Sequence, residues 1–167
     1  YKYAAKNNKR QMAIDLLSEI SDKDLRDVSL VVLKDNLDNS VKGKGEIYNA
    51  YILNPRVSNE MLRPYKKELA SYFNREQTKK FRDNPQELIN WVKDSINVND
   101  ELNARNIPMD SRSVLKHRIT DSRSRNIFFV SMARSLGIAS RIDPVTGKVQ
   151  YIKGNDWIDV KFEENAV

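Results

Sequence analysis

The chain has 167 residues, of which 40% are hydrophobic and 31% charged, which is typical of one folded globular unit and excludes an intrinsically disordered chain. Its 29 lysines and arginines exceed its 23 acidic residues, but the two kinds are interleaved, as in KDLRDVSLVVLKDNLD, so we expect no nucleic-acid binding. With no cysteine and a single histidine, the chain cannot form disulfides or supply a cysteine nucleophile, and we expect neither a metal site nor another cofactor.

The first third of the chain predicts helices. Apolar residues recur at helical spacing around Leu16 and again from Leu25 to Leu33, where Ser21 is the N-cap because an acidic residue lies three positions later. A loop with two glycines follows in NSVKGKGE and leads into the apolar run IYNAYIL, which stops at Pro55. Two consecutive helices and a loop are therefore expected before this proline.

The middle third predicts two further helices. The spacing of apolar residues from Met61 to Phe73 is helical, with Ser58 as the candidate N-cap. Asn84 caps a second helix, which starts with a proline and continues to Ile96. The segment NVNDELNARNIPMD after it is polar and irregular, so we expect a surface linker there.

The last third changes from helices to strands. Residues 111–117 favour a short helix, and a longer one begins at Asp121 or Ser122 and ends at Gly137. The longer helix is apolar on nearly every face, which predicts burial. Beyond it, the alternating runs IASRID, KVQYI and WIDVKF are separated by turn residues and predict an antiparallel meander of three strands.

These elements make an α+β fold in one compact unit. We expect a helical N-terminal extension over residues 1–104 and a core of a buried helix on a small antiparallel sheet over residues 105–167. The opening YKYAAKNNKR has no initiator methionine and indicates a piece of a longer protein. No apolar stretch approaches the about 20 residues of a transmembrane helix, so we expect no membrane span.

The segment TDSRSRNIFFVSMARSLGIASRID resembles the central segment of transglutaminase-like, papain-related domains. In that family a cysteine begins a buried helix, the helix ends in a Leu-Gly-Ile turn, and an arginine opens the first strand. Counting back from the turn at residues 136–138 places the cysteine position on Ser122. The resemblance therefore implies a papain/transglutaminase-like core whose nucleophile is replaced by serine.

A second resemblance lies upstream. LNPRVSNEMLRPYKKEL is similar to a segment that precedes the core in a bacterial branch of the same superfamily, so the likeness extends from Val28 to Phe162. One departure is Ala139, where the family usually has a proline after the turn. The resemblance implies an exported bacterial protein, periplasmic or extracellular.

The family's catalytic histidine and acid have no clear counterparts. The histidine belongs on the second strand, and two hairpin registers place Thr146 or Asn155 there, neither of which is a base. Asp159 on the third strand is the candidate remnant acid. His117 is a candidate displaced base, with a surface or capping role as the alternative. A serine hydroxyl does not ionise near neutrality and needs such a base, so the alternative for Ser122 itself is an N-cap.

The residues around this position define the candidate site. We expect no catalytic residues, and a ligand surface at the old active-site groove beside Ser122, Arg123, Trp157 and Asp159. Nearby arginines favour either a basic cleft for an anionic ligand or bridges to acids such as Asp121; they are Arg112, Arg118 and Arg125.

A further polar cluster follows Pro55. Arg56, Asn59 and Glu60 either line a groove or, as we favour, belong to a helix start where Arg56 and Glu60 pair across the first turn.

The sequence therefore predicts a non-catalytic transglutaminase-like domain, a pseudoenzyme that serves as a binding or scaffolding module in a larger bacterial protein. Its expected partners are a peptide, protein or glycan ligand and other domains of the parent chain. One alternative is an active hydrolase or acyltransferase that uses Ser122 as its nucleophile. Another is a purely structural domain.

Overall fold

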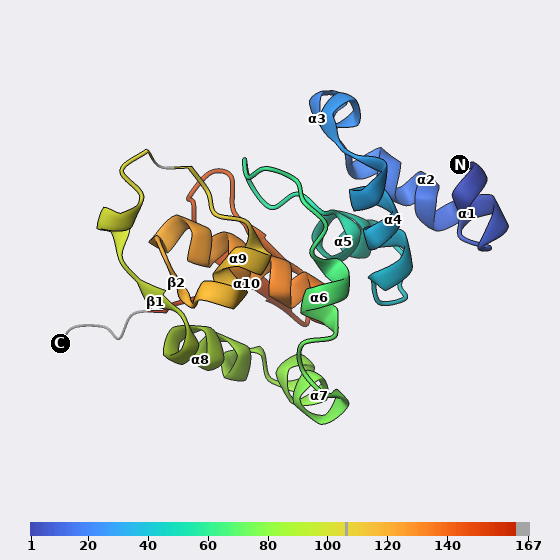
Figure 1. The fold of residues 1–167 in the computed structure, drawn as a ribbon. Coiled ribbons are helices and arrows are strands. Elements are labelled where there is room, and N and C mark those ends of the chain that lie inside the picture. The colour runs from blue at the N-terminus through green and yellow to red at the C-terminus, as the bar shows by residue number, and fades with distance from the viewer. Residues whose placement is uncertain (106, 163–167) are drawn as a thin grey trace.

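The computed structural model describes residues 1–105 and 107–162 (Figure 1). The first half is helical: α1 (Lys2–Lys6), α2 (Arg10–Glu19), α3 (Asp22–Asp27), α4 (Leu30–Asn39), α5 (Glu46–Tyr48) leading into the π-helix η1 (Asn49–Leu53), α6 (Lys66–Ala70), α7 (Arg75–Asp83) and α8 (Pro85–Ser95). The second half contains β1 (Asn97–Val98), the 3-10 helix η2 (Asp100–Leu102), α9 (Ser111–His117), β2 (Ile119–Thr120), α10 (Ser122–Leu136), β3 (Ser140–Ile142), β4 (Val149–Lys153) and β5 (Asp156–Asp159). The predicted α+β class is confirmed.

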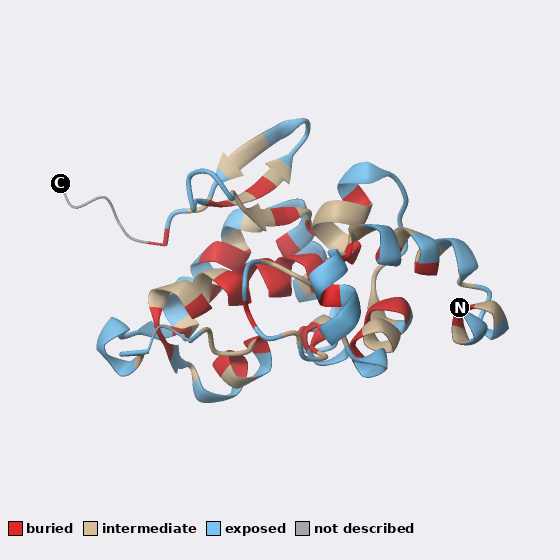
Figure 2. Ribbon diagram, turned by 90° about the horizontal axis from the view of Figure 1, so that it is seen from above, coloured by how far each residue is buried: buried red, intermediate tan, exposed pale blue. Residues whose placement is uncertain are grey.

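Helix α10 is the buried centre of the second half. The Asp121 side chain caps it by accepting a hydrogen bond from the Ser124 amide, and Gly137 ends it in the left-handed conformation at φ 90°. Most of its residues are buried, and they form the largest concentration of buried positions in the molecule (Figure 2). The predicted buried helix is confirmed, but its N-cap is Asp121, so the capping role considered for Ser122 is wrong.

The predicted three-stranded meander is also confirmed. Strands β3, β4 and β5 pair antiparallel in this order, with Gln150 opposite Arg141 on one side and Asp159 on the other. Val149 and Tyr151 are buried against the core. Because side chains alternate between the faces of a sheet, Gln150 and Asp159 lie on the face turned away from that core.

Buried side chains form two clusters. The larger draws on α6 to α10 and the sheet and includes the fully buried Phe128 and Phe129. The smaller joins α1, α2, α4, α5 and η1 around Leu16 and Leu53. In Figure 1 the N-terminal helices gather at one end of the molecule, and α10 crosses its middle. The larger cluster thus contains residues from both the predicted N-terminal extension (1–104) and the predicted core (105–167).

The helix predicted from Ser58 is mostly wrong. Only Lys66–Ala70 is helical, and residues 54–65 have no regular secondary structure. The carboxylate of Glu60 folds back to accept hydrogen bonds from the amides of Val57 and Ser58, at 2.7 and 2.8 Å. Pro64 further disfavours helical geometry at the residue before it. Of the apolar residues in this spacing, Tyr65, Leu69 and Phe73 are buried in the larger cluster, whereas Met61 is 66% exposed.

Two other boundaries differ from the predictions. The helix expected from Ser21 to Leu33 is broken, because Ser29 caps α4 by accepting the amide of Val32 at 3.3 Å. Helix α7 was missed, although Asn74 and Gln77 form a capping box at its start. The predicted linker contains β1, which pairs with β2 in parallel, while its residue 106 lies outside the described residues.

Candidate functional site

The N-terminal tip of α10 holds Ser122 beneath an acidic side chain. Asp100 of η2 accepts the Ser122 amide at 2.7 Å, and Asp121 accepts the Ser124 amide at 3.1 Å. The β1–β2 pair positions Asp100, because the Asn99 amide donates to the Thr120 carbonyl at 2.8 Å and so carries η2 over the helix start. Two carboxylates therefore already accept hydrogen bonds from backbone amides that could otherwise bind an anion at the helix N-terminus.

Both carboxyls are held ionised at the tip. Hydrogen bonds from the backbone amide and hydroxyl of Ser122 lower the pKa of Asp100 below its usual value. Burial opposes ionisation of Asp121, but hydrogen bonds from Ser124 outweigh it and lower that pKa as well. A carboxylate with a lowered pKa is a poor acceptor for the proton of an alcohol, so Asp100 does not activate the Ser122 hydroxyl as a general base.

No base faces this hydroxyl from the positions that the sequence suggested. His117 is exposed at the end of α9, and within the described residues its ring makes no hydrogen bond or ion pair. Thr146 lies in the turn between β3 and β4, where its hydroxyl donates to Asp143 at 2.8 Å. Asn155 is exposed in the turn between β4 and β5.

Trp157 and Asp159 lie on the face of the sheet opposite to α10. Asp159 accepts hydrogen bonds from Gln150 at 2.8 Å and Lys148 at 3.2 Å, and these lower its pKa. Trp157 packs under the guanidinium of Arg141, whose Cζ lies 4.0 Å from the ring centroid. The structure thus separates this pair of predicted site residues from Ser122 and Arg123 at the helix tip.

The neighbouring arginines do not converge on one cleft. The Cζ of Arg118 lies 5.0 Å from a ring centroid of Trp91, and that of Arg125 lies 4.3 Å from the ring centroid of Phe162. Arg112 forms an ion pair with an acid of α6 at 3.7 Å. Arg118 and Arg125 thus pack on aromatic rings, and Arg112 forms an ion pair on the surface, as long basic side chains commonly do.

A groove of about 710 Å³ opens beside the tip of α10. Its walls are α3 and the two irregular segments 56–63 and 107–110, and we call it the α3 groove. Arg123 donates to the Asn59 side chain in one wall, and the Met109 amide donates to the Ser124 hydroxyl from another at 2.8 Å. The helix start and the groove are therefore in direct contact.

The polar cluster after Pro55 lines this groove. Arg56 binds Asp24 of α3 through two nitrogens, at 2.5 and 2.8 Å, and donates to the main-chain carbonyl of Glu60 at 2.6 Å. The favoured pairing of the Arg56 and Glu60 side chains across a helical turn is wrong, because no helix forms there. The alternative, in which these residues line a groove, is confirmed.

Comparison with known proteins adds the family. The family model described as the transglutaminase-like superfamily matches residues 67–165, more than half of the chain. The chain belongs to the transglutaminase-like superfamily. No curated protein and no solved structure matches it.

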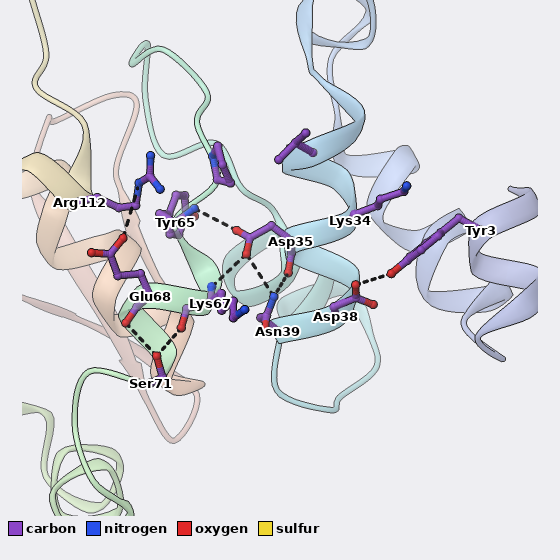
Figure 3. A pocket seen from close by; sticks show the side chains of 12 residues that line it. Tyr3, Lys34, Asp35, Asp38, Asn39, Tyr65, Lys67, Glu68, Ser71 and Arg112 are labelled. Carbon is purple, nitrogen blue, oxygen red and sulfur yellow. Dashed lines mark hydrogen bonds and ion pairs between the residues drawn. The ribbon is translucent and has the colours of Figure 1, made fainter.

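A second hollow of about 610 Å³ lies between α4 and α6 of this transglutaminase-like protein. Figure 3 shows Asp35 pointing at the start of α6, where it accepts the amides of Tyr65, Lys66 and Lys67 at 2.9, 2.7 and 3.0 Å. Asp38 in turn binds the Tyr3 hydroxyl. Because Asp35 and Asp38 form hydrogen bonds that hold helices together, we interpret this hollow as a structural interface between helices.

Two buried basic side chains join the smaller cluster to the transglutaminase-like core. Arg134 of α10 donates to the carbonyls of Asn54, Arg56 and Ser140, at 2.7 to 3.0 Å. Lys66 is fully buried and donates to the Ile52 carbonyl at 2.7 Å. Burial, and then the nearby Arg134, lower the pKa of Lys66 to about 7. Sequence analysis missed both residues, although a charge inside an otherwise apolar helix marks Arg134 as unusual.

Two negative findings complete the site. In the part of the chain that the structure describes, no three His, Cys, Asp or Glu side chains are grouped so that they could hold a metal ion. Over the same residues, no helix has the length and apolar character needed to cross a membrane.

Proposed function

We propose that this transglutaminase-like domain is a non-catalytic binding module of a larger, exported bacterial protein. The observation that carries the proposal is the helix tip, where the amide of Ser122, the residue that the resemblance assigns to the nucleophile position, donates to the Asp100 carboxylate at 2.7 Å. Acyl transfer needs an activated nucleophile and donors aimed at the developing oxyanion. Here the carboxylates of Asp100 and Asp121 already accept hydrogen bonds from the amide donors of the helix start.

The sheet supports the same proposal. A catalytic base on β4 or β5 would have to project toward α10, but the side chains of these strands that pack against the core are Val149, Tyr151 and Ile158. Lys153 and Asp156 on the same face are exposed at the hairpin turn. None of the three packed side chains accepts a proton near neutral pH. The α3 groove supplies a surface for a ligand, because it is large and one of its lining residues, Asn59, accepts a hydrogen bond from Arg123, which is next to Ser122 in α10.

An amine-incorporation assay tests the proposal. The purified chain is incubated with a glutamine-containing protein and a fluorescent amine, and release of ammonia from glutamine peptides is measured in parallel. We expect the wild type and Ser122→Ala to give the same background, because neither contains an activated nucleophile. Turnover by the wild type that disappears in Ser122→Ala would overturn the proposal.

A further inference from the structure

The segment that joins the two clusters is held by its main-chain carbonyls. Lys66 of α6 donates to the Ile52 carbonyl at 2.7 Å, and the Tyr65 hydroxyl donates to the Pro55 carbonyl at 2.9 Å. Arg134 of α10 donates to the two carbonyls that flank this proline, at 2.9 and 2.7 Å. All three donating side chains are buried, and we call them the carbonyl clamp.

The carbonyl clamp lies between two packing units of unequal size. In the described part of the chain, the smaller cluster has 7 buried hydrophobic residues and the larger has 20. The N-terminal helices gather at one end of the molecule, whereas the elements of the larger cluster surround α10 (Figure 1). Because a unit with few buried apolar contacts opens at a lower free-energy cost, the smaller cluster can separate while the larger one stays packed.

Lys66 has no acidic partner inside the clamp. Its side chain is fully buried, and burial followed by the guanidinium of Arg134 lowers its pKa to about 7. Asp35 of α4 acts in the opposite direction, but its carboxylate accepts three amides of α6 and forms no ion pair with Lys66 among the described residues. The other ionisable groups that face the clamp act on Arg134; they are Glu19 of α2, Tyr51 of η1, Glu60 and Tyr65.

We propose that the carbonyl clamp is a pH-dependent joint, which opens when the amine of Lys66 takes up a proton and lets the helices up to Leu53 separate as one unit from α6 and α10. In the closed joint the ammonium would be buried beside the guanidinium of Arg134, whereas in the open joint water solvates it. The neutral amine avoids this cost and keeps the joint closed. This inference concerns the coupling of the two clusters and does not depend on the proposed function.

The direction of the pH dependence follows from proton linkage. The open joint exposes Lys66, whose pKa then returns toward 10.5, whereas in the closed joint it is about 7. Between these values the open state holds a proton that the closed state lacks. The equilibrium constant for opening should therefore increase about tenfold for each unit by which the pH falls, and it should become constant below about pH 7.

Native-state hydrogen exchange of the purified chain tests the proposal. The exchange rates of peptides from residues 10–39 and 122–136 are measured at pH 8 and pH 9. Dividing each rate by that of an unstructured chain at the same pH gives the opening constant of the segment. At pH 8 we expect residues 10–39 to open at least about tenfold more often than α10. Their opening constant should fall about tenfold at pH 9.

Three variants assign this behaviour to Lys66. Lys66→Met has no charge to bury, so the opening constant of residues 10–39 should be the same at both pH values. Lys66→Arg carries a permanent charge and should open frequently at both. Lys67→Met is the matched control, because Lys67 is the next residue of α6 and is exposed, and it should behave like the wild type.

Four results would overturn the proposal. In the wild type, one is equal opening constants for residues 10–39 and α10, which means that the chain opens only as a whole, and another is an opening constant of residues 10–39 that does not change with pH. Either decides the matter even if a variant fails to fold. The others are an undiminished pH dependence in Lys66→Met and a lost one in Lys67→Met. The amine-incorporation assay is unaffected by all four.

Discussion

Ser122 lies where two opposing electrostatic effects meet. A helix N-terminus carries a partial positive charge of about one half, which lowers the pKa of a thiol placed there. Asp100 and Asp121 each bring a full negative charge to the same tip, and both bind its amides directly. Because the carboxylates outweigh the helix dipole, this tip disfavours any developing anion.

This balance predicts the behaviour of a cysteine at the same position. In Ser122→Cys the thiol pKa should be at or above the ordinary value of about 8.5, because Asp100 repels a thiolate. Adding Asp100→Asn should lower it. The pH dependence of alkylation by iodoacetamide measures this pKa, and the natural sequence contains no other cysteine to interfere. A thiol pKa near 6 in the single variant would contradict the account of the tip.

The buried amine of Lys66 predicts a pH dependence of stability. Its pKa falls from 10.5 to about 7 in the folded chain, so between these values the unfolded chain holds a proton that the folded chain does not. The free energy of unfolding should therefore rise with pH across this window, by up to about 1.4 kcal/mol per pH unit. Below about pH 7 both states are protonated and the full penalty is present.

Urea unfolding of the wild type and Lys66→Met between these pH values checks this prediction. Other groups titrate in the same range, so the difference between the two proteins is the relevant quantity. The wild type should gain stability relative to Lys66→Met as the pH rises. Parallel pH profiles of the two proteins would show that Lys66 keeps its proton in the folded state.

At the scale of elements, α6 depends on a side chain from another helix. Asp35 of α4 accepts three consecutive amides at the start of α6, which is a capping role supplied from a distance in sequence. Asp35→Ala should lower the free energy of unfolding by about 2 kcal/mol, because charged hydrogen bonds to a helix start are lost.

Asp38→Ala, three positions later in the same helix, is the matched control for this cap. Asp38 is more exposed and binds Tyr3 and Lys9, so its loss should cost less than about 1 kcal/mol. The midpoints of urea unfolding compare the two variants. Equal losses would argue against a dominant role of Asp35 in fixing α6.

The sequence predictions were accurate for elements whose start and end signals lie within their own residues, and inaccurate for elements that depend on residues distant in sequence. Helix α10 carries its own cap and its own Gly137 stop, and the meander carries its turns, so both could be predicted. The segment after Ser58 could not, because Glu60 and Arg56 make contacts that no helical periodicity records. Asp100 reaches Ser122 across 22 positions through a two-residue strand pair, which has no recognisable pattern.

At the scale of the whole molecule, α10 links the two clusters and the groove. Its Arg134 holds the carbonyls of residues 54 and 56, its start contacts the groove walls, and its apolar faces fill the larger cluster. The family resemblance anticipated the core, but the α3 groove joins three segments far apart in sequence. Its location therefore emerged only from the fold, and neither Trp157 nor Asp159 lines it.

The central claim is that the hydroxyl at this tip is chemically inert. The most direct measurement is the intact mass of the chain after incubation with a fluorophosphonate probe, which modifies activated serines. We predict an unmodified wild-type mass under conditions that fully label a control serine hydrolase. A single adduct mapped to Ser122, and absent from Ser122→Ala, would contradict the account.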